Sequence, residues 1–309
     1  MTTQETTTTS SARFRYWTGA LLVFLAAFCF ALKGVLIKIA YSYSIDSISL
    51  LTLRMVFSLP FYGLIAFRLS RRLPPARLSV RNWVWVGVLG ATGYYLASYA
   101  NFLGLVYIQA SLERILLFVY PTFVLLLGAT LYRRRVTRLQ VVALALTYSG
   151  IIIAFVPNLG LSGQKNIWLG AFWVILSGLI YAVYLVGSDS MIPRLGSQRY
   201  TCYALMAATL PIILHCWAAN GLALFHYSMP VYALSLLMAV VVTVIPTFMM
   251  SEGIKRVGSG NASIIGSIGP IFTIVLATTL LGEVISLYQL IGTALVLFGV
   301  FLIGWKGRK

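Results

Sequence analysis

Residues 17–40 read WTGALLVFLAAFCFALKGVLIKIA, an apolar run of 24 residues whose charged side chains are Lys33 and Lys38. A helix that crosses the hydrocarbon core of a bilayer needs about 20 mainly apolar residues, so this run predicts a transmembrane helix. The run is too long for the core of a signal peptide, and no small-residue cleavage site stands out. We therefore expect a retained first helix after a disordered cytoplasmic tail at residues 1–16, which are polar and rich in threonine.

Similar apolar segments fill the rest of the chain. Of its 309 residues 60% are hydrophobic and only 9% are charged, whereas about a quarter are charged in soluble domains. Ten segments are long enough to cross a bilayer: 17–40, 47–69, 82–104, 110–132, 136–156, 167–188, 199–218, 229–252, 260–281 and 286–305. The sequence thus predicts an all-α integral membrane protein with ten transmembrane helices, followed by a short cytoplasmic tail at residues 306–309.

The net charge of +17 is distributed in a way that predicts the topology. With a cytoplasmic N-terminus, 18 of the 23 Lys and Arg residues fall in cytoplasmic segments, four lie within helices, and the outer loops hold only Lys165. This asymmetry follows the positive-inside rule and predicts that both termini are cytoplasmic. Topology and attraction to anionic lipid head groups account for the basic charge, so we expect membrane lipids and no nucleic acid as partners.

The two halves of the sequence resemble each other. A shift of 151 residues aligns Gly19 with Gly170 and Pro60 with Pro211. A shift of 149 residues aligns Gly104 with Gly253, Pro121 with Pro270, Gln140 with Gln289 and Gly150 with Gly299. Each repeat, residues 17–156 and 167–305, then holds five helices, and because five is odd the second should cross the membrane in the opposite sense. Inverted repeats are typical of secondary transporters, whose substrate site lies near the midplane between the repeats.

Residues 262–303, ASIIGSIGPIFTIVLATTLLGEVISLYQLIGTALVLFGVFLI, carry a further pattern made of Pro270, Leu281-Gly282-Glu283, Gln289 and Gly292. In this pattern the chain resembles the drug/metabolite transporter superfamily, specifically its ten-helix EamA family, over essentially its whole length. The first half departs from the pattern, with Tyr132-Arg133-Arg134 in place of Leu-Gly-Glu and Leu144 in place of the closing Gly. The Tyr-rich third helix resembles the YddG-type amino-acid exporters. The resemblance implies export of amino acids, aromatic ones included, or related metabolites across a bacterial cytoplasmic (inner) membrane.

The sequence lacks the residue patterns that several other classes of function need. Cys29, Cys202 and Cys216 lie in apolar segments at spacings that fit neither a zinc site nor a disulfide framework. His215 and His226 have no carboxylate or second His at catalytic spacing, and the sequence has no phosphate-binding P-loop. We therefore expect no metal, no cofactor, no ATP-driven transport within this chain and no enzymatic activity.

Charged side chains within the apolar segments are candidates for function, because each costs about 2.5–3.5 kcal/mol on insertion scales. They are Lys33, Lys38, Arg54, Glu113 and Arg114, all in the outer half of the predicted helices. We expect Lys33 to face a substrate cavity and the other four to line a water-accessible outer vestibule. The alternatives are snorkelling to the membrane surface for Lys38 and Arg114 and a structural ion pair for Glu113.

Polar stripes on otherwise apolar helices predict the walls of the cavity. Tyr94, Ser98 and Asn101 are spaced i, i+4 and i+7 and so share one helix face. The expected lining comprises Lys33, Tyr94, Tyr95, Ser98, Tyr99, Asn101, Tyr181, Tyr184, Thr243 and Thr247. Tyrosine suits an amphipathic substrate because it offers an apolar ring and a hydroxyl. The alternative for these stripes is hydrogen bonding between helices, worth about 0.6 kcal/mol a contact.

Pro121, Pro246 and Pro270 fall inside apolar segments, where proline removes a helical hydrogen bond and commonly causes a kink. We expect them to act as hinges in an alternating-access carrier of a small-molecule substrate, with static kinks as the alternative. The alternative function is exchange of organic anions such as sugar phosphates or nucleotide sugars. That site should need two or more cations converging on one cavity.

Overall fold

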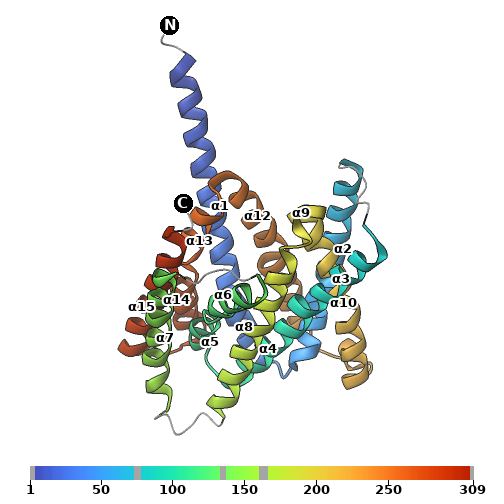
Figure 1. Ribbon diagram of the computed structural model, residues 1–309. Helices are drawn as coiled ribbons and strands as arrows, with labels where there is room; N and C mark the ends of the chain where they lie inside the picture. The colour runs from blue at the N-terminus through green and yellow to red at the C-terminus, as the bar shows by residue number, and fades with distance from the viewer. Residues whose placement is uncertain (1–3, 73–77, 133–136, 160–165, 307–309) are drawn as a thin grey trace.

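The structure, a computed structural model, describes residues 4–72, 78–132, 137–159 and 166–306, and these ranges contain helices and turns but no strand (Figure 1). In chain order the elements are α1 (Gln4–Tyr41), α2 (Ser47–Arg72), α3 (Val80–Gly90), η1 (Ala91–Leu96), α4 (Ala97–Tyr107), α5 (Ala110–Leu117), α6 (Tyr120–Tyr132), α7 (Arg138–Leu159), α8 (Ile167–Ser188), α9 (Ile192–Leu195), α10 (Ser197–Asn220), η2 (Ala223–Phe225), α11 (Met229–Leu237), η3 (Met238–Val244), α12 (Ile245–Val257), α13 (Ser259–Gly266), α14 (Gly269–Leu281) and α15 (Leu287–Lys306).

Eight segments of the described chain are long and apolar enough to cross a membrane. Two other predicted spans, 82–104 and 286–305, are also helical, within α3–η1–α4 and α15. The first has a lower hydropathy than the eight, because tyrosines and Asn101 make α3–η1–α4 more polar. The second is shorter, because the apolar part of α15 covers only Leu287–Leu302. The all-helical membrane fold is therefore confirmed with eight clear candidate spans.

Two predicted spans are broken rather than continuous. The segment 110–132 divides into α5 and α6, and the segment 260–281 divides into α13 and α14. Pro121 and Pro270 are each the second residue of the helix after the break. Proline has no N–H to donate and its ring clashes with the carbonyl one turn earlier, so the preceding helix ends there. The kinks expected from the sequence are thus interruptions of the helix.

The first helix is longer than expected. Residues 1–16 were predicted as a disordered tail, but α1 begins at Gln4 and projects beyond the other helices (Figure 1). Adding residues to an existing helix gains one hydrogen bond per residue without a new nucleation step. The long apolar helix can therefore extend into a threonine-rich segment that would not nucleate a helix by itself.

The helix boundaries recur along the chain. The starts of α5, α6 and α7 at Ala110, Tyr120 and Arg138 lie 149 residues before the starts of α13, α14 and α15 at Ser259, Gly269 and Leu287. A π-helical segment follows both α3 and α11, as η1 and η3. The N-termini of α7 and α15 also carry matching caps, in which the side-chain oxygen of Gln140 accepts from the Thr137 N–H and that of Gln289 accepts from the Ser286 N–H.

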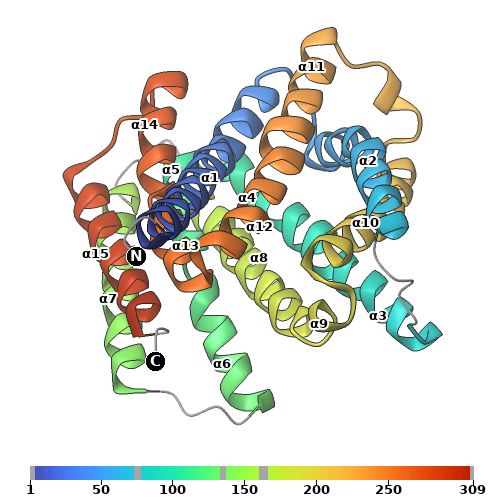
Figure 2. The same cartoon turned by 90° about the horizontal axis from the view of Figure 1, so that it is seen from above.

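Glycines allow three pairs of helices to approach closely. Gly104 of α4 faces Gly170 of α8, and Gly253 of α12 faces Gly19 of α1. At the edge of the molecule α7 and α15 lie side by side in both views (Figures 1 and 2), and a Cβ on Gly150 would lie 2.5 Å from the Gly292 carbonyl oxygen. Small residues at such contacts are typical of helix packing in membranes, where van der Waals contact contributes much of the association.

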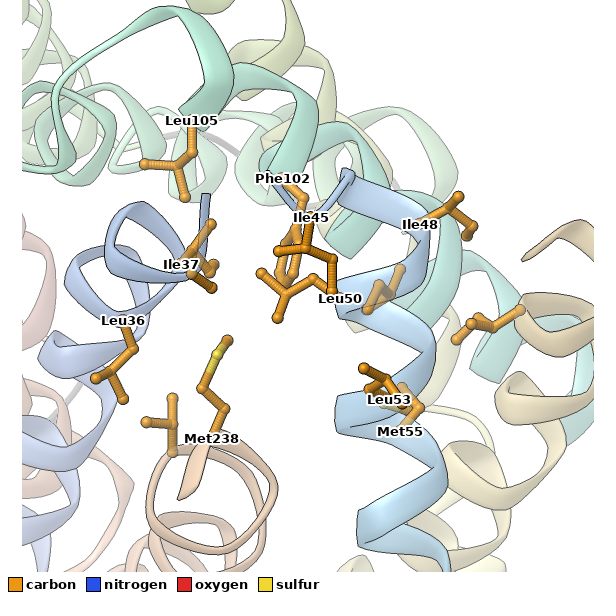
Figure 3. Close-up of a cluster of buried hydrophobic side chains, with 14 of the residues drawn as sticks. Leu36, Ile37, Ile45, Ile48, Leu50, Leu53, Met55, Phe102, Leu105 and Met238 are labelled. Atoms are coloured by element: carbon orange, nitrogen blue, oxygen red, sulfur yellow. The ribbon is translucent and has the colours of Figure 1, made fainter. Parts of the chain in front are cut away.

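The largest apolar cluster joins α1, α2, α4, α10 and η3, with single residues from other elements. Leu36, Leu50, Met55, Phe102 and Met238 are all buried in it, and Figure 3 shows their side chains between and beside these helices. The cluster fixes α1 and α2 against the second half of the chain at the level where the charged side chains of both helices occur.

Replacing Gly150 with Ala should lower the free energy of unfolding by about 1–3 kcal/mol, and with it the melting temperature, because the new methyl group forces α7 and α15 apart. Gly87→Ala is the matched control, since a Cβ there meets nothing within 4 Å. Fluorescence-detected thermal unfolding in detergent measures both variants. Equal loss of stability in the two would contradict the close contact.

Candidate functional site

A cavity of about 590 Å³ lies between helices of both halves of the chain. Its walls come from α1, α2, η1, α4, α8, α10, η3, α12, α15 and the two broken segments α5–α6 and α13–α14. Figure 2 shows α1, α4, α8, α12 and α13 grouped in the middle of the molecule. Its polar and charged lining comprises Lys33, Arg54, Tyr94, Ser98, Asn101, Arg114, Tyr120, Ser177, Tyr181, Thr201, Thr243, Thr247 and Ser267.

The structure brings together seven of the ten residues that were predicted to line a substrate cavity. Lys33, Tyr94, Ser98, Asn101, Tyr181, Thr243 and Thr247 border it. Tyr95, Tyr99 and Tyr184 do not: Tyr95 and Tyr99 lie against His215, and Tyr184 is buried behind Tyr94. The i, i+4, i+7 face of Tyr94, Ser98 and Asn101 is therefore the cavity face of this helix.

Lys33 is connected to the buried carboxylate of Glu113 through the side chain of Asn101. The Lys33 Nζ donates to the Asn101 Oδ1 at 2.8 Å, and the Asn101 Nδ2 donates to the Glu113 Oε1 at 2.6 Å. The direct distance from Lys33 Nζ to Glu113 Oε1 is 3.8 Å. The Glu113 side chain is 2% exposed and does not border the cavity, whereas Lys33 and Asn101 do. Glu113 thus balances the charge of Lys33 from behind the cavity wall.

Arg54 and Arg114 have no such carboxylate. Neither makes an ion pair within the described part of the chain, and the Nε atom of each is buried without a hydrogen-bond partner there. Their guanidinium groups lie 5.1 Å and 5.8 Å from the ring centroids of Phe102 and Phe118, which is cation–π range. A buried guanidinium group, that of Arg54, and a half-buried one, that of Arg114, border one cavity without a carboxylate and make it electropositive.

Tyrosine rings form another part of the cavity wall. The Tyr184 hydroxyl donates to the Tyr94 hydroxyl at 2.9 Å, and the rings of Tyr120 and Tyr181 meet edge to face at 5.6 Å. Gly93 leaves room for the Tyr184 ring, because a Cβ at Gly93 would overlap it. The cavity is therefore bordered both by three cations and by tyrosine rings with hydroxyl groups.

The π-helical segments were missed by the sequence analysis. Ala91–Leu96 and Met238–Val244 each border the cavity, through Gly93 and Tyr94 and through Val242 and Thr243. The Thr243 hydroxyl donates to the Met238 carbonyl five residues earlier, at 3.0 Å. Single-turn π segments are frequent at functional sites. Pro246 follows η3 in the first turn of α12 and was the available signal for an interruption there.

The four charges expected in an outer vestibule do not form a single site. Arg54 and Arg114 line the central cavity, and Glu113 lies behind it. Lys38 instead borders a second pocket of about 630 Å³ with Asp46 and Tyr99. Among the described residues no group of three His, Cys, Asp or Glu side chains could hold a metal ion.

Glu283 of the Leu-Gly-Glu pattern caps a helix of the other half. Its carboxylate accepts from the Ala110 N–H at 2.8 Å and the Ser111 hydroxyl at 2.6 Å, at the start of α5. A carboxylate at a helix N-terminus satisfies free N–H groups and complements the helix dipole. Glu283 therefore fixes the helix that carries Glu113 and Arg114.

Comparison with known proteins identifies relatives over nearly the whole chain. The model of the EamA-like transporter family matches twice, at residues 17–156 and 168–305. A Bacillus subtilis (strain 168) protein named uncharacterized transporter YcbK is 31% identical over 297 residues, covering 94% of this chain and 93% of its own. A probable terminal-alkyne amino-acid exporter of Streptantibioticus cattleyicolor is 25% identical over 243 residues, covering 75% and 77%.

One solved crystal structure has the same fold. It superposes with a TM-score of 0.65 over 94% of this chain and 99% of its own, at 16% sequence identity. At that identity the likeness concerns the arrangement of helices alone.

Replacing Lys33 with Met should lower the free energy of unfolding by about 3–5 kcal/mol, because it leaves Glu113 buried without its cation. Arg54→Met should leave stability unchanged or raise it, since it removes a buried charge that has no carboxylate. Thermal unfolding in detergent compares the two. The double variant K33M/E113Q should recover most of the loss, and a failure to recover would contradict the coupling.

Asp46 gives a pH-dependent contribution to stability at the start of α2, where its carboxylate accepts from the N–H groups of Ile48 and Ser49. Burial raises the pKa of this carboxyl, but hydrogen bonds from Ser49, Tyr227 and Asn220 outweigh it and hold the pKa below its usual value. The stability from Asp46 is therefore present at neutral pH and is lost as the pH falls through that lowered pKa. Asp46→Asn keeps a side chain that can cap the helix but removes the negative charge at its N-terminus, so it should lower the melting temperature at pH 7 by roughly 2–4 °C and less toward pH ~3. A deficit that grows on acidification would contradict this assignment.

Proposed function

The chain belongs to the EamA-like transporter family, and from that membership we propose that it is an alternating-access carrier that exports amino acids and related small metabolites. It is an integral multi-pass membrane transporter and not an enzyme, and its bacterial relatives indicate the inner membrane. The observation that carries the proposal is the cavity between the two halves, which is bordered by Lys33, Arg54 and Arg114 together with tyrosine rings.

Ten transmembrane helices in two inverted repeats, 17–156 and 167–305, are part of this proposal, with both termini cytoplasmic. The constant offset between helix starts supports it, as does the pairing of glycines. The Gly104–Gly170 contact of α4 with α8 and the Gly253–Gly19 contact of α12 with α1 join equivalent residues of the two halves. Contacts that are duplicated in this way are expected of two halves related by a pseudo-twofold axis, which gives inward-open and outward-open states of similar energy.

The charge of the cavity supports a substrate with a carboxylate. A guanidinium group binds a carboxylate through charge-assisted hydrogen bonds, which are strong in a site of low dielectric constant. The tyrosines supply apolar faces and hydroxyl groups for the remainder of an amphipathic molecule. Among the relatives, the probable terminal-alkyne amino-acid exporter is named for a substrate of this chemistry.

The helix breaks support a moving wall. Pro121 and Pro270 interrupt two segments at positions 149 residues apart, and both segments border the cavity. We assign Pro121, Pro246 and Pro270 as hinges, because backbone freed from helical hydrogen bonding can absorb the change in direction when one side closes.

A second candidate is exchange of organic anions such as sugar phosphates. It has one specific observation in its favour, namely that three cations border a single cavity. A doubly charged substrate would match two guanidinium groups without carboxylate partners.

The test uses purified protein in liposomes loaded with a mixture of amino acids, with efflux followed by mass spectrometry. A subset of amino acids should leave only when the protein is present, and Arg54→Met should slow their efflux about tenfold or more, the equivalent of ~1.4 kcal/mol. Arg68→Met is the matched control, because Arg68 is exposed on the same helix and does not border the cavity.

Absence of amino-acid efflux with folded protein would contradict the leading proposal. Liposomes loaded with a sugar phosphate, with and without external sugar phosphate, then test the second candidate. Protein-dependent loss of the internal compound only when the external compound is present would identify an exchanger.

A further inference from the structure

We propose that Glu113 is a proton-binding site that couples proton movement to the substrate, through exchange of its Lys33 partner for the substrate carboxylate. The inference rests on the proposed function, because it requires a carboxylate-bearing substrate in the central cavity. It concerns a group outside the cavity and assigns the proton as the coupling ion.

The geometry places Lys33 between Glu113 on one side and the cavity, where a substrate carboxylate would bind, on the other. Its Nζ is 2.8 Å from Asn101 Oδ1 and 3.8 Å from Glu113 Oε1, while its side chain is 23% exposed to the cavity. Glu113 lies behind Lys33 and Asn101 and is 2% exposed. A substrate in the cavity can therefore approach Lys33 but not Glu113.

The charges around Glu113 determine its protonation state when Lys33 changes partner. The charged or titratable groups that the structure places around Glu113 are Lys33 of α1, which contacts it, and Arg114, which lies beside it on α5. Tyr120 of α6 and Tyr181 of α8 lie near Arg114, Arg54 of α2 lies near Lys33, and Glu283 before α15 binds the start of α5. Glu283 is occupied by the start of α5, and the Nε atoms of both arginines have no partner among the described residues. Lys33 is thus the cation in ion-pair contact with Glu113 in the described chain.

A substrate carboxylate on Lys33 leaves Glu113 with the neutral amide of Asn101 as its hydrogen-bond donor. An ionised carboxylate without a cation is strongly destabilised in a buried site, and it becomes neutral by taking up a proton. The balance is one proton from the aqueous phase bound to a Glu113 oxygen for each carboxylate that displaces Glu113 from Lys33. When the substrate leaves on the other side of the membrane, Lys33 returns to Glu113, and Glu113 releases its proton on the side to which the substrate left.

The ammonium group of an amino acid cannot replace Lys33 as the partner of Glu113, because Glu113 does not border the cavity. The carrier would then move about one proton in the same direction as each substrate molecule, whichever gradient drives it. A facilitated carrier with the same cavity would move none.

The experiment uses the full chain in liposomes that contain an amino-acid mixture and a trapped pH-sensitive dye. Valinomycin and equal potassium concentrations hold the membrane potential at zero. Efflux through the wild-type protein should make the lumen more alkaline by about one proton per amino acid released. Efflux without a change in luminal pH would overturn the proposal while leaving the carrier function intact, whereas absence of efflux would count against the carrier function itself.

The Glu113→Gln variant tests whether Glu113 is the residue that binds the transported proton. This variant should still exchange labelled for unlabelled amino acid, which needs no net proton movement, and should lose both the luminal pH change and the pH dependence of efflux. Glu252→Gln is the control, because Glu252 is a partly exposed carboxylate paired with Lys255 and Arg256 on α12, outside the cavity. Coupling that survives E113Q would overturn the assignment.

If E113Q does not fold, Glu113→Asp replaces it. Aspartate keeps a titratable carboxylate and draws it one methylene away from Lys33, so coupling should persist with a shifted pH dependence. An unshifted pH dependence would contradict the role of the Lys33–Glu113 contact.

Discussion

A lysine charge inside an apolar bundle is stabilised by an opposite charge, and Glu113 supplies that charge to Lys33. Asn101 bridges the two groups, and Glu283 of the other half holds the N-terminus of α5, the helix that carries Glu113. Helices of both halves are therefore tied together around one polar site. Arg54 and Arg114 stand beside that site without carboxylates, which leaves an excess of positive charge for a substrate to neutralise.

The surrounding helices combine rigid contacts with interruptions. Close glycine contacts such as Gly150 with Gly292 hold helix pairs at short distance, and a larger side chain there would separate them. The breaks before Pro121 and Pro270 and the π segments lie instead along the cavity. Backbone that departs from α-helical hydrogen bonding inside a membrane is tolerated where it is enclosed by protein or lines a cavity. This distribution suits a carrier whose packed pairs move as bodies while the cavity wall changes shape.

Much of this architecture could be predicted from hydropathy and internal repetition, because both act over 20 residues or more. The cavity face of Tyr94, Ser98 and Asn101 was predicted from helical spacing. Tyr95 and Tyr99 lie against His215 instead, and composition alone does not tell which face of a Tyr-rich helix meets the cavity. Contacts between distant segments lay beyond sequence reasoning: the partner of Glu113 lies on another helix, 80 positions earlier in the numbering. The helix breaks carried a signal in their prolines, but a proline alone does not distinguish a kink from an interruption.

If the cavity opens alternately to the two sides of the membrane, a thiol in its wall should change its accessibility when substrate binds. Met250→Cys, which places a thiol in the cavity wall, would be introduced after replacement of Cys29, Cys202 and Cys216. A membrane-impermeant thiol reagent would then be applied from each side of oriented vesicles, with and without a saturating amino-acid mixture. The account predicts that substrate raises the labelling rate from one side as it lowers the rate from the other. Labelling from a single side under all conditions, or equal unchanging rates from both, would contradict it.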